Sequence, residues 1–153
     1  MLTWQCSPFG ELSNKTLYAI LQARQVVFVV EQNCPFLDAD DKDEHCLHLL
    51  GWKARAQDSL LAVYARLVPP GVKYLEPSIG RVLTVPEFRG QGFGKELIER
   101  AVQEMEKLYP GLAIRIGAQQ YLERFYSGFG FVTVSPAYLE DGIPHVEMLR
   151  QGA

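Results

Sequence analysis

The chain has 153 residues, of which 48% are hydrophobic and 22% are charged, and its formal net charge is −3. This length is typical of one domain with a substantial core, and the composition excludes a disordered or fibrous chain. A nucleic-acid-binding protein would be expected to carry a basic stripe. We therefore expect a single domain over residues 1–153 with no nucleic-acid partner.

The sequence shows no hydrophobic run close to the roughly 20 residues of a membrane span. Its first residues lack the basic and hydrophobic segments of a signal peptide, so we expect a cytoplasmic protein with no membrane partner. The three cysteines, Cys6, Cys34 and Cys46, have no C-x-x-C spacing. They predict reduced thiols and no metal site.

Hydrophobic periodicity and turn residues predict a mixed α/β layer in which helices flank one central sheet. In chain order the predicted elements are a strand at 2–9, a helix capped by Ser13 or Asn14, strands at 46–54, 60–68 and 78–85, a helix at 95–108, a strand at 112–118, a helix at 119–129, and strands at 131–134 and 146–149.

The end of the first helix is difficult to predict. Its hydrophobic spacing continues into residues 26–30, which are β-prone, and Cys34-Pro35 ends it in any case. Residues 38–44 then carry five acids in seven positions. A calcium loop would need glycine and glutamate where the sequence has Asp43 and Leu49. We expect a solvated acidic loop, which could also face a cationic substrate.

Arg89-Gly90-Gln91-Gly92-Phe93-Gly94 lies between the hydrophobic run 79–85 and the amphipathic stretch 95–108. A strand, a glycine-rich turn and a helix together offer backbone N–H groups and a positive helix end to a phosphate. Glycines let an anion approach the main chain closely. The segment therefore predicts a phosphate-binding turn.

Two nucleotide motifs fail on these residues. A Walker A loop requires a hydroxyl after its lysine to bind magnesium, and Glu96 follows Lys95. A Rossmann fingerprint requires a third glycine where Lys95 stands. Neither a nucleotide triphosphate nor a dinucleotide is favoured.

The remaining pattern, Arg-x-x-Gly-x-Gly over residues 89–94, resembles the acetyl-CoA motif of the Gcn5-related N-acetyltransferase (GNAT) superfamily, [Q/R]-x-x-G-x-[G/A]. Residues 125–131 resemble the later superfamily helix that ends in Tyr-x-x-x-Gly-Phe, and one helix and one strand separate the two motifs. Three further segments, residues 27–35, 48–53 and 140–145, resemble the ElaA group of bacterial acetyltransferases. The similarity covers almost the whole chain.

This resemblance implies an α/β fold of the α+β type, with a central, mostly antiparallel sheet that is flanked by helices and splayed between its fourth and fifth strands. It implies acetyl-CoA as the acyl donor and no metal. The turn's amides would hold the pyrophosphate, with Gly92 and Gly94 least able to accept a side chain, and backbone amides near Leu83 and Val85 would hold the thioester carbonyl. The implied cofactor-binding residues are Leu83, Thr84, Val85, Arg89, Gly90, Gln91, Gly92, Phe93, Gly94, Lys95, Gln119 and Tyr126.

Tyr126 is the candidate general acid. A phenol with a pKa near ~10 stays protonated at neutral pH and can donate a proton to a thiolate of pKa ~8.5. Gln119 replaces an asparagine that is frequent in the superfamily. The general base stays open, with His145 preferred on the substrate side; the candidates are Glu31, His48, Glu76, Asp141 and His145.

The implied function is transfer of an acetyl group from acetyl-CoA to a primary amine, of a small molecule or of a protein, by direct attack in a ternary complex. A CoA-binding module without catalysis and transfer to a hydroxyl group stay open as alternatives. The acidic loop mildly favours a cationic acceptor. Dimers formed through sheet edges are common in the superfamily, so a homodimer is a further expectation.

Overall fold

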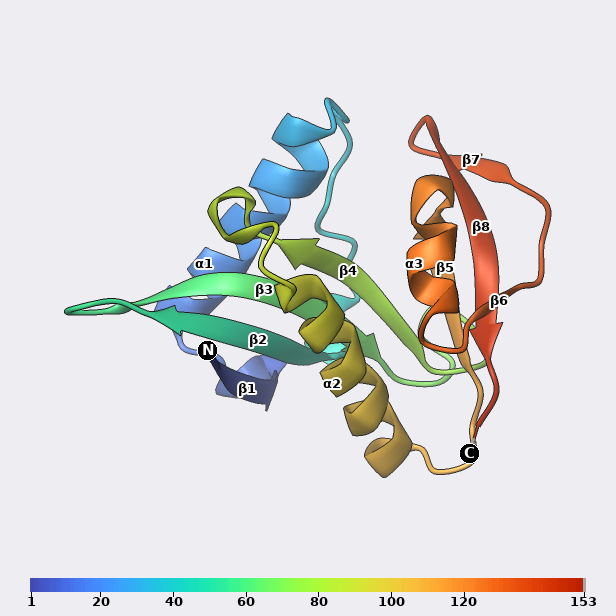
Figure 1. Cartoon of the computed structure of the whole chain (residues 1–153), viewed down its shortest axis with the longest axis horizontal. Coiled ribbons are helices and arrows are strands. Elements are labelled where there is room, and N and C mark those ends of the chain that lie inside the picture. The colour runs from blue at the N-terminus through green and yellow to red at the C-terminus, as the bar shows by residue number, and fades with distance from the viewer. Residues whose placement is uncertain (153) are drawn as a thin grey trace.

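The strands of the computed structural model, which describes residues 1–152, form two sheets (Figure 1). Four antiparallel strands make the first sheet in the order β1 (Leu2–Pro8), β2 (Leu47–Ala54), β3 (Ser59–Val68) and β4 (Ser78–Thr84). In the second sheet three strands pair antiparallel with β8 (Ile143–Arg150), namely β5 (Ile114–Gln119), β6 (Val132–Thr133) and β7 (Tyr138–Glu140).

The two sheets meet along β4 and β5 and then diverge (Figure 1). Just before β4 begins, the C=O of Pro77 accepts a hydrogen bond of 3.0 Å from the N–H of Arg115 in β5. Among residues 1–152 the two strands share no ladder beyond this point. The predicted splay between the fourth and fifth strands is confirmed, and a cleft lies between them.

The first helix, α1 (Asn14–Arg24), begins at Ser13, whose Oγ accepts a hydrogen bond of 3.1 Å from the N–H of Thr16. It continues as a π-helical segment, Gln25–Glu31. The β-prone residues 26–30 are therefore helical, because Val27 packs with Ile20 into a cluster on one face of the first sheet and this burial outweighs local propensity.

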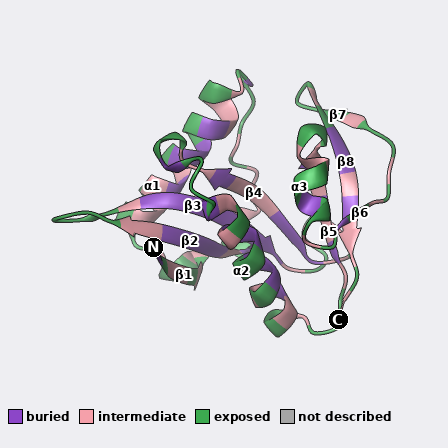
Figure 2. Ribbon diagram, in the orientation of Figure 1, coloured by how far each residue is buried: buried purple, intermediate pink, exposed green. Residues whose placement is uncertain are grey.

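The second helix, α2 (Phe93–Leu108), covers the opposite face of the first sheet (Figures 1 and 2). Its buried stripe packs on β3 and β4 and consists of Phe93, Leu97, Ile98, Ala101, Val102 and Met105. The third helix is shorter than predicted, because a 3₁₀ turn, Gln120–Leu122, precedes α3 (Glu123–Ser127). Across residues 1–152, no helix has both the length and the hydrophobicity to cross a membrane.

Residues 140–145 form a hairpin between β7 and β8, so the last strand begins earlier than residue 146, where the sequence predicted it. The turn consists of Asp141 and Gly142, both in the left-handed region with φ of 51° and 77°. An Asp-Gly pair with two positive φ angles is typical of the tight turns that join twisted strands. His145 consequently belongs to β8, where it pairs with Tyr138 and with Gln119.

The acidic loop is also not the solvated loop that the sequence predicted. Arg24, which is 0% exposed, lies 2.6 Å from both Asp38 and Asp43. Arg66 lies 2.7 Å from Asp40 and 3.0 Å from Asp43. Burial opposes the charges of Asp40 and Asp43, but the arginines outweigh it and hold the pKa of both carboxyls below the usual value. These acids are neutralised within the fold and give no support for a cationic acceptor.

Candidate active site

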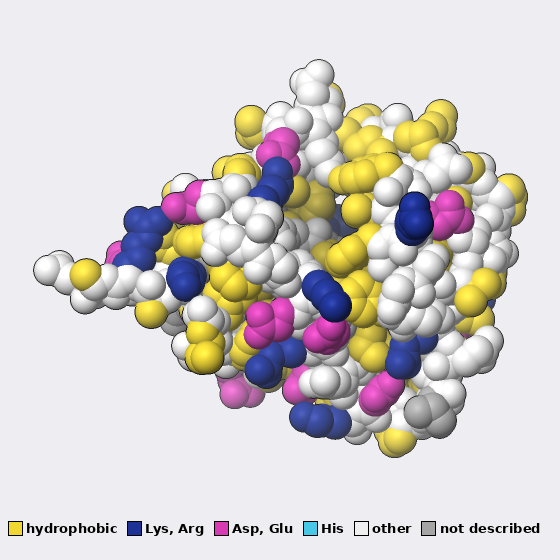
Figure 3. Space-filling model, in the orientation of Figure 1, with side chains coloured by type: hydrophobic (Ala, Val, Ile, Leu, Met, Phe, Trp, Pro, Cys, Tyr) yellow, Lys and Arg dark blue, Asp and Glu magenta, His cyan; other side chains and the backbone are white. Residues whose placement is uncertain are grey.

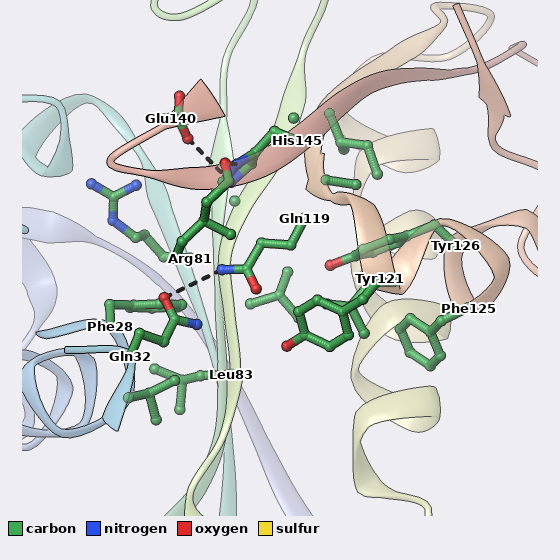
Figure 4. Close-up of a pocket in the computed structure, with 18 of the residues that line it drawn as sticks. Phe28, Gln32, Arg81, Leu83, Gln119, Tyr121, Phe125, Tyr126, Glu140 and His145 are labelled. Atoms are coloured by element: carbon green, nitrogen blue, oxygen red, sulfur yellow. Dashed lines mark hydrogen bonds and ion pairs between the residues drawn. The ribbon is translucent and has the colours of Figure 1, made fainter. Parts of the chain in front are cut away.

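A cavity of about 490 Å³ opens between β4 and β5. Its walls come from the π-helical segment, both diverging strands, the 3₁₀ turn together with α3, and the β7–β8 hairpin (Figure 4). Hydrophobic side chains are exposed along the hollow between the two halves of the molecule (Figure 3). A long ligand that threads between two strands would fit this shape.

A β-bulge in β4 bends the strand at the cavity. Tyr64 of β3 pairs with Leu83, but Arg66 pairs with Gly80, so β4 has one extra residue between these pairs. Arg81 lies in the bulge with φ 49°, a left-handed conformation that costs about 1–3 kcal/mol. Its guanidinium lies 2.8 Å from the carboxylate of Asp38 and donates from Nη2 to the C=O of Asp38 at 2.9 Å. Bulges of this kind redirect a strand next to functional sites.

The backbone of β4 offers a different amide from the one predicted. The N–H of Val85 donates to the C=O of Ala62 at 2.9 Å, so the expectation that this amide is free is wrong. N–H groups alternate in direction along an antiparallel strand, so the N–H of Leu83 points toward β3, as the N–H of Val85 does. The main-chain groups of Thr84 point the other way, toward the cavity, and its C=O accepts a hydrogen bond of 3.1 Å from Arg89.

The glycine turn adopts a conformation that restricts two of its positions. Gly90 and Gly92 both have φ of +80°, where an L-residue would be strained. This confirms the prediction for Gly92. Gly94 has no such constraint, and a Cβ there would be in ordinary contact, 3.5 Å from Thr84 Oγ1. The protein's own packing thus does not require glycine at position 94, which lines the cavity.

The turn also presents free N–H groups at the start of α2. Glu96 donates to the C=O of Gly92, and the N–H groups of the three residues before it have no partner within the helix. These residues are Phe93, Gly94 and Lys95. They form a site for an anion at the positive end of the helix dipole. The side chain of Phe93 is buried in the core, while Gln91 and Lys95 are exposed.

Arg89 forms an ion pair with the carboxylate of Glu31. Its two Nη atoms lie 2.8 Å and 2.7 Å from the carboxylate oxygens of Glu31, at the end of the π-helical segment. Both side chains are partly exposed, at 43% and 40%. A phosphate that binds Arg89 would have to share or displace Glu31.

Tyr126 extends its hydroxyl from α3 into the cavity (Figure 4). Its ring is 7% exposed and packs edge-on against Phe125 and Phe131, with centroids 5.2 Å and 6.1 Å apart. Burial raises the pKa of this phenol well above its usual value. The hydroxyl is therefore protonated at neutral pH and available to donate.

His145 faces the same cavity from β8. Its Nδ1 donates to the C=O of Ile143 at 2.7 Å, and its Nε2 lies 3.4 Å from the carboxylate of Glu140 (Figure 4). Its ring stacks on Tyr138 at a centroid distance of 5.9 Å. The imidazole is thus held in one orientation next to a carboxylate.

Two of the other candidate bases lie outside the cavity. His48 is 1% exposed, and its ring nitrogens lie 2.6 Å from the hydroxyl of Tyr64 and 2.9 Å from the C=O of Asp43. Burial lowers its pKa, so it is a neutral core residue. Glu76 pairs with Arg115 at 3.0 Å. Glu31 and Asp141 do line the cavity, as His145 does.

Gln119 bridges the cleft: its amide donates to the side-chain oxygen of Gln32 at 3.3 Å (Figure 4). Four further residues line the cavity that no sequence motif assigned to the site, namely Gln32, Lys73, Arg81 and Glu140. The Asp141-Gly142 turn signal could have predicted the hairpin and with it Glu140. The positions of the other three residues depend on long-range packing.

Residues 48–151 match the family model described as the acetyltransferase (GNAT) domain. Protein ElaA of Escherichia coli is 41% identical over 153 residues, which covers 99% of this chain and 97% of that protein. Its crystal structure superposes with a TM-score of 0.90 at 40% identity, covering 99% of this chain and all (100%) of that one. An acyl-CoA N-acyltransferase from Pseudomonas aeruginosa superposes with a TM-score of 0.91 at 41% identity, covering 98% and 99%. The chain therefore belongs to the GNAT acetyltransferase family.

Proposed function

We propose that the chain, as one domain over residues 1–153, transfers the acetyl group of acetyl-CoA to a primary amine by direct attack in a ternary complex. The observation that carries the proposal is the cleft between β4 and β5, which has a free helix N-terminus at one end and a buried, protonated phenol on its wall. Elements of both sheets line this cleft, so neither half forms the site alone.

The donor would bind along β4. The amides at the start of α2 would hold the pyrophosphate, with Arg89 adding charge once it leaves Glu31, and the pantetheine arm would run between β4 and β5. The cavity-facing N–H of Thr84 would hydrogen-bond this arm. The side-chain amide of Gln119 would hydrogen-bond the same arm from β5, once its hydrogen bond to Gln32 is broken.

The neutral amine would attack the thioester carbonyl, forming the new C–N bond, and the C–S bond would then break. Tyr126 would donate its proton to the departing thiolate. The proton released by the amine would pass to His145, whose Nε2 is adjacent to the carboxylate of Glu140. The free enzyme would be restored when Tyr126 takes up a proton and His145 gives up the one that it accepted, both by exchange with solvent.

Two measurements test this function. Calorimetric titration with acetyl-CoA should show one site per chain, and a thiol-release assay over a panel of primary amines should show turnover. Binding without turnover on any amine would favour a CoA-binding module. Turnover on alcohols instead of amines would assign an O-acyltransferase.

A further inference from the structure

Lys73 supplies a cation at the end of the cavity where β4 and β5 meet. The loop between β3 and β4 places it there, with its Nζ 5.3 Å from the centroid of the Tyr74 ring. Across residues 1–152 no carboxylate lies within ion-pair distance, 4.0 Å, of this ammonium. The exposed Lys73 thus lines the cavity without a direct ion pair among these residues.

The hydroxyl groups of Tyr74 and Tyr138 lie near this ammonium, next to Gly117. A Cβ on Gly117 of β5 would lie 2.9 Å from Tyr74 Oη, 3.1 Å from Tyr138 Oη and 4.0 Å from Lys73 Nζ. The ammonium and the two hydroxyls, each of which can donate a hydrogen, form a set of donors suited to an anion.

Of the charged side chains around this set, Arg81 and Glu147 have ion-pair partners, Glu140 has only the imidazole of His145, and Asp141 has none among residues 1–152. Arg81 is held by Asp38 at 2.8 Å, and Glu147 by Arg115 at 2.9 Å. Glu140 lies 3.4 Å from His145. Asp141 lies at the exposed tip of the hairpin. Lys73 is an exposed residue. Partial desolvation of its ammonium lowers the pKa, while the charge of Glu140 raises it, and a bound anion would offset the desolvation.

Resting on the function proposed above, we propose that the acceptor amine also carries a carboxylate, which binds to Lys73 and the Tyr74–Tyr138 hydroxyl pair. The reacting amine faces His145 and Glu140 at the same time. This assignment replaces the cationic acceptor that the acidic loop suggested.

The geometry of β5 also sets the spacing within the acceptor. His145 pairs with Gln119, two residues beyond Gly117, and two residues span about 7 Å along a strand. Carboxylate and amine are therefore several bonds apart, as in an ω-amino acid or the side-chain amine of lysine. An α-amino group next to its own carboxylate would not reach both positions.

The test compares 6-aminohexanoate with its neutral amide, 6-aminohexanamide, as acceptors in the thiol-release assay. We expect a KM at least about tenfold lower for the acid, because a charge-assisted hydrogen bond is lost with the amide. Lys73→Met should raise the KM of the acid to that of the amide and leave kcat unchanged, whereas Lys73→Arg should retain most of the preference. Lys107→Met, which removes an exposed lysine of α2, is the matched control.

The outcomes separate this inference from the proposed function. Acetylation of both acceptors with equal KM, or an equal effect of Lys73→Met on both, overturns the carboxylate subsite and leaves the acetyltransferase intact. If no amine is turned over, the proposed function fails, and calorimetric binding of 6-aminohexanoate to the CoA-saturated protein still decides the subsite. Binding that is lost in Lys73→Met supports it, and absence of binding to the unaltered protein overturns it.

A second pair of acceptors identifies the source of the carboxylate. The peptide Gly-Lys and its C-terminal amide carry the same side-chain amine, and free lysine carries it without the peptide bond. Preference for Gly-Lys over both others indicates a protein C-terminus as acceptor. Preference for free lysine or 6-aminohexanoate indicates a small molecule.

Discussion

The two ends of the cavity are built in different ways. The proposed donor end is a contiguous piece of backbone, the glycine turn and the first turn of α2, so acetyl-CoA binding there would depend on N–H groups and φ angles. The proposed acceptor end is assembled from side chains of the β3–β4 loop, β7 and β8, and the buried arginine–aspartate pairs lie behind it. We expect the donor end to be sensitive at a few glycines and the acceptor end to be sensitive to distant substitutions.

The largest effect is expected where the two ends meet, at Tyr126. Tyr126→Phe keeps the ring and removes the proton donor, so kcat should fall about 10²- to 10⁴-fold while the KM for acetyl-CoA stays unchanged. Steady-state thiol release measures both constants. Tyr18→Phe, on the exposed face of α1, is the control. An unchanged kcat would assign the general acid to another group.

Arg24→Met tests the support behind the acceptor end. It leaves Asp38 and Asp43, 10% and 15% exposed, without this partner, and the free energy of unfolding should fall by about 3–5 kcal/mol. Urea denaturation measures the loss. The control, Arg55→Met, breaks an exposed pair with Glu87 and should cost about 0–1 kcal/mol. Equal losses in the two variants would show that the buried pairs do not stabilise the fold.

Gly92→Ala tests the donor end alone. A left-handed φ costs an L-residue about 1–2 kcal/mol, and relaxation of the turn should weaken acetyl-CoA binding by about tenfold. Calorimetric titration gives the dissociation constant. Gly10→Ala, at an open position without a positive φ, should leave it unchanged. Unaltered affinity in Gly92→Ala would exclude the turn's conformation as a determinant of binding.

The smallest effect is expected for Glu31→Gln, which frees Arg89 for the donor. Because exposed ion pairs are worth about 0–1 kcal/mol, the dissociation constant of acetyl-CoA should fall by up to about fivefold. Glu87→Gln, which frees Arg55 in the same way, is the matched control. Weaker binding in Glu31→Gln would mean that Glu31 orients Arg89 instead of competing with the ligand.

The elements that could be predicted from the sequence are those formed by residues contiguous in the chain. Helix α2, the glycine turn and the splayed strands follow from local patterns and from two spaced motifs, and the structure confirms these elements. The π-helical segment could not be predicted, because Val27 is helical only through its packing against the first sheet. The acidic loop was misjudged for the same reason, since its partners Arg24 and Arg66 lie on α1 and β3.

At the site itself, residue type was easier to predict than hydrogen-bond direction. The sequence placed Tyr126 and His145 at the cavity, and both line it. The sequence did not show which main-chain N–H groups of β4 lack a hydrogen bond, because that depends on the register between β3 and β4. The hydrogen bond from the N–H of Val85 to the C=O of Ala62 therefore excludes the predicted contact between this N–H and the thioester. Lys73 reaches Gly117 only through the tertiary fold.

The backbone hydrogen bond from Arg115 to Pro77 makes one amide proton a natural reporter of how the two sheets move. Exchange of this proton with deuterium requires the seam between β4 and β5 to open, whereas protons inside each sheet exchange through separate openings. Glu76 and Glu147 clamp the Arg115 side chain at the same place. A ligand that spreads the strands would speed exchange at Arg115, and one that closes them would slow it.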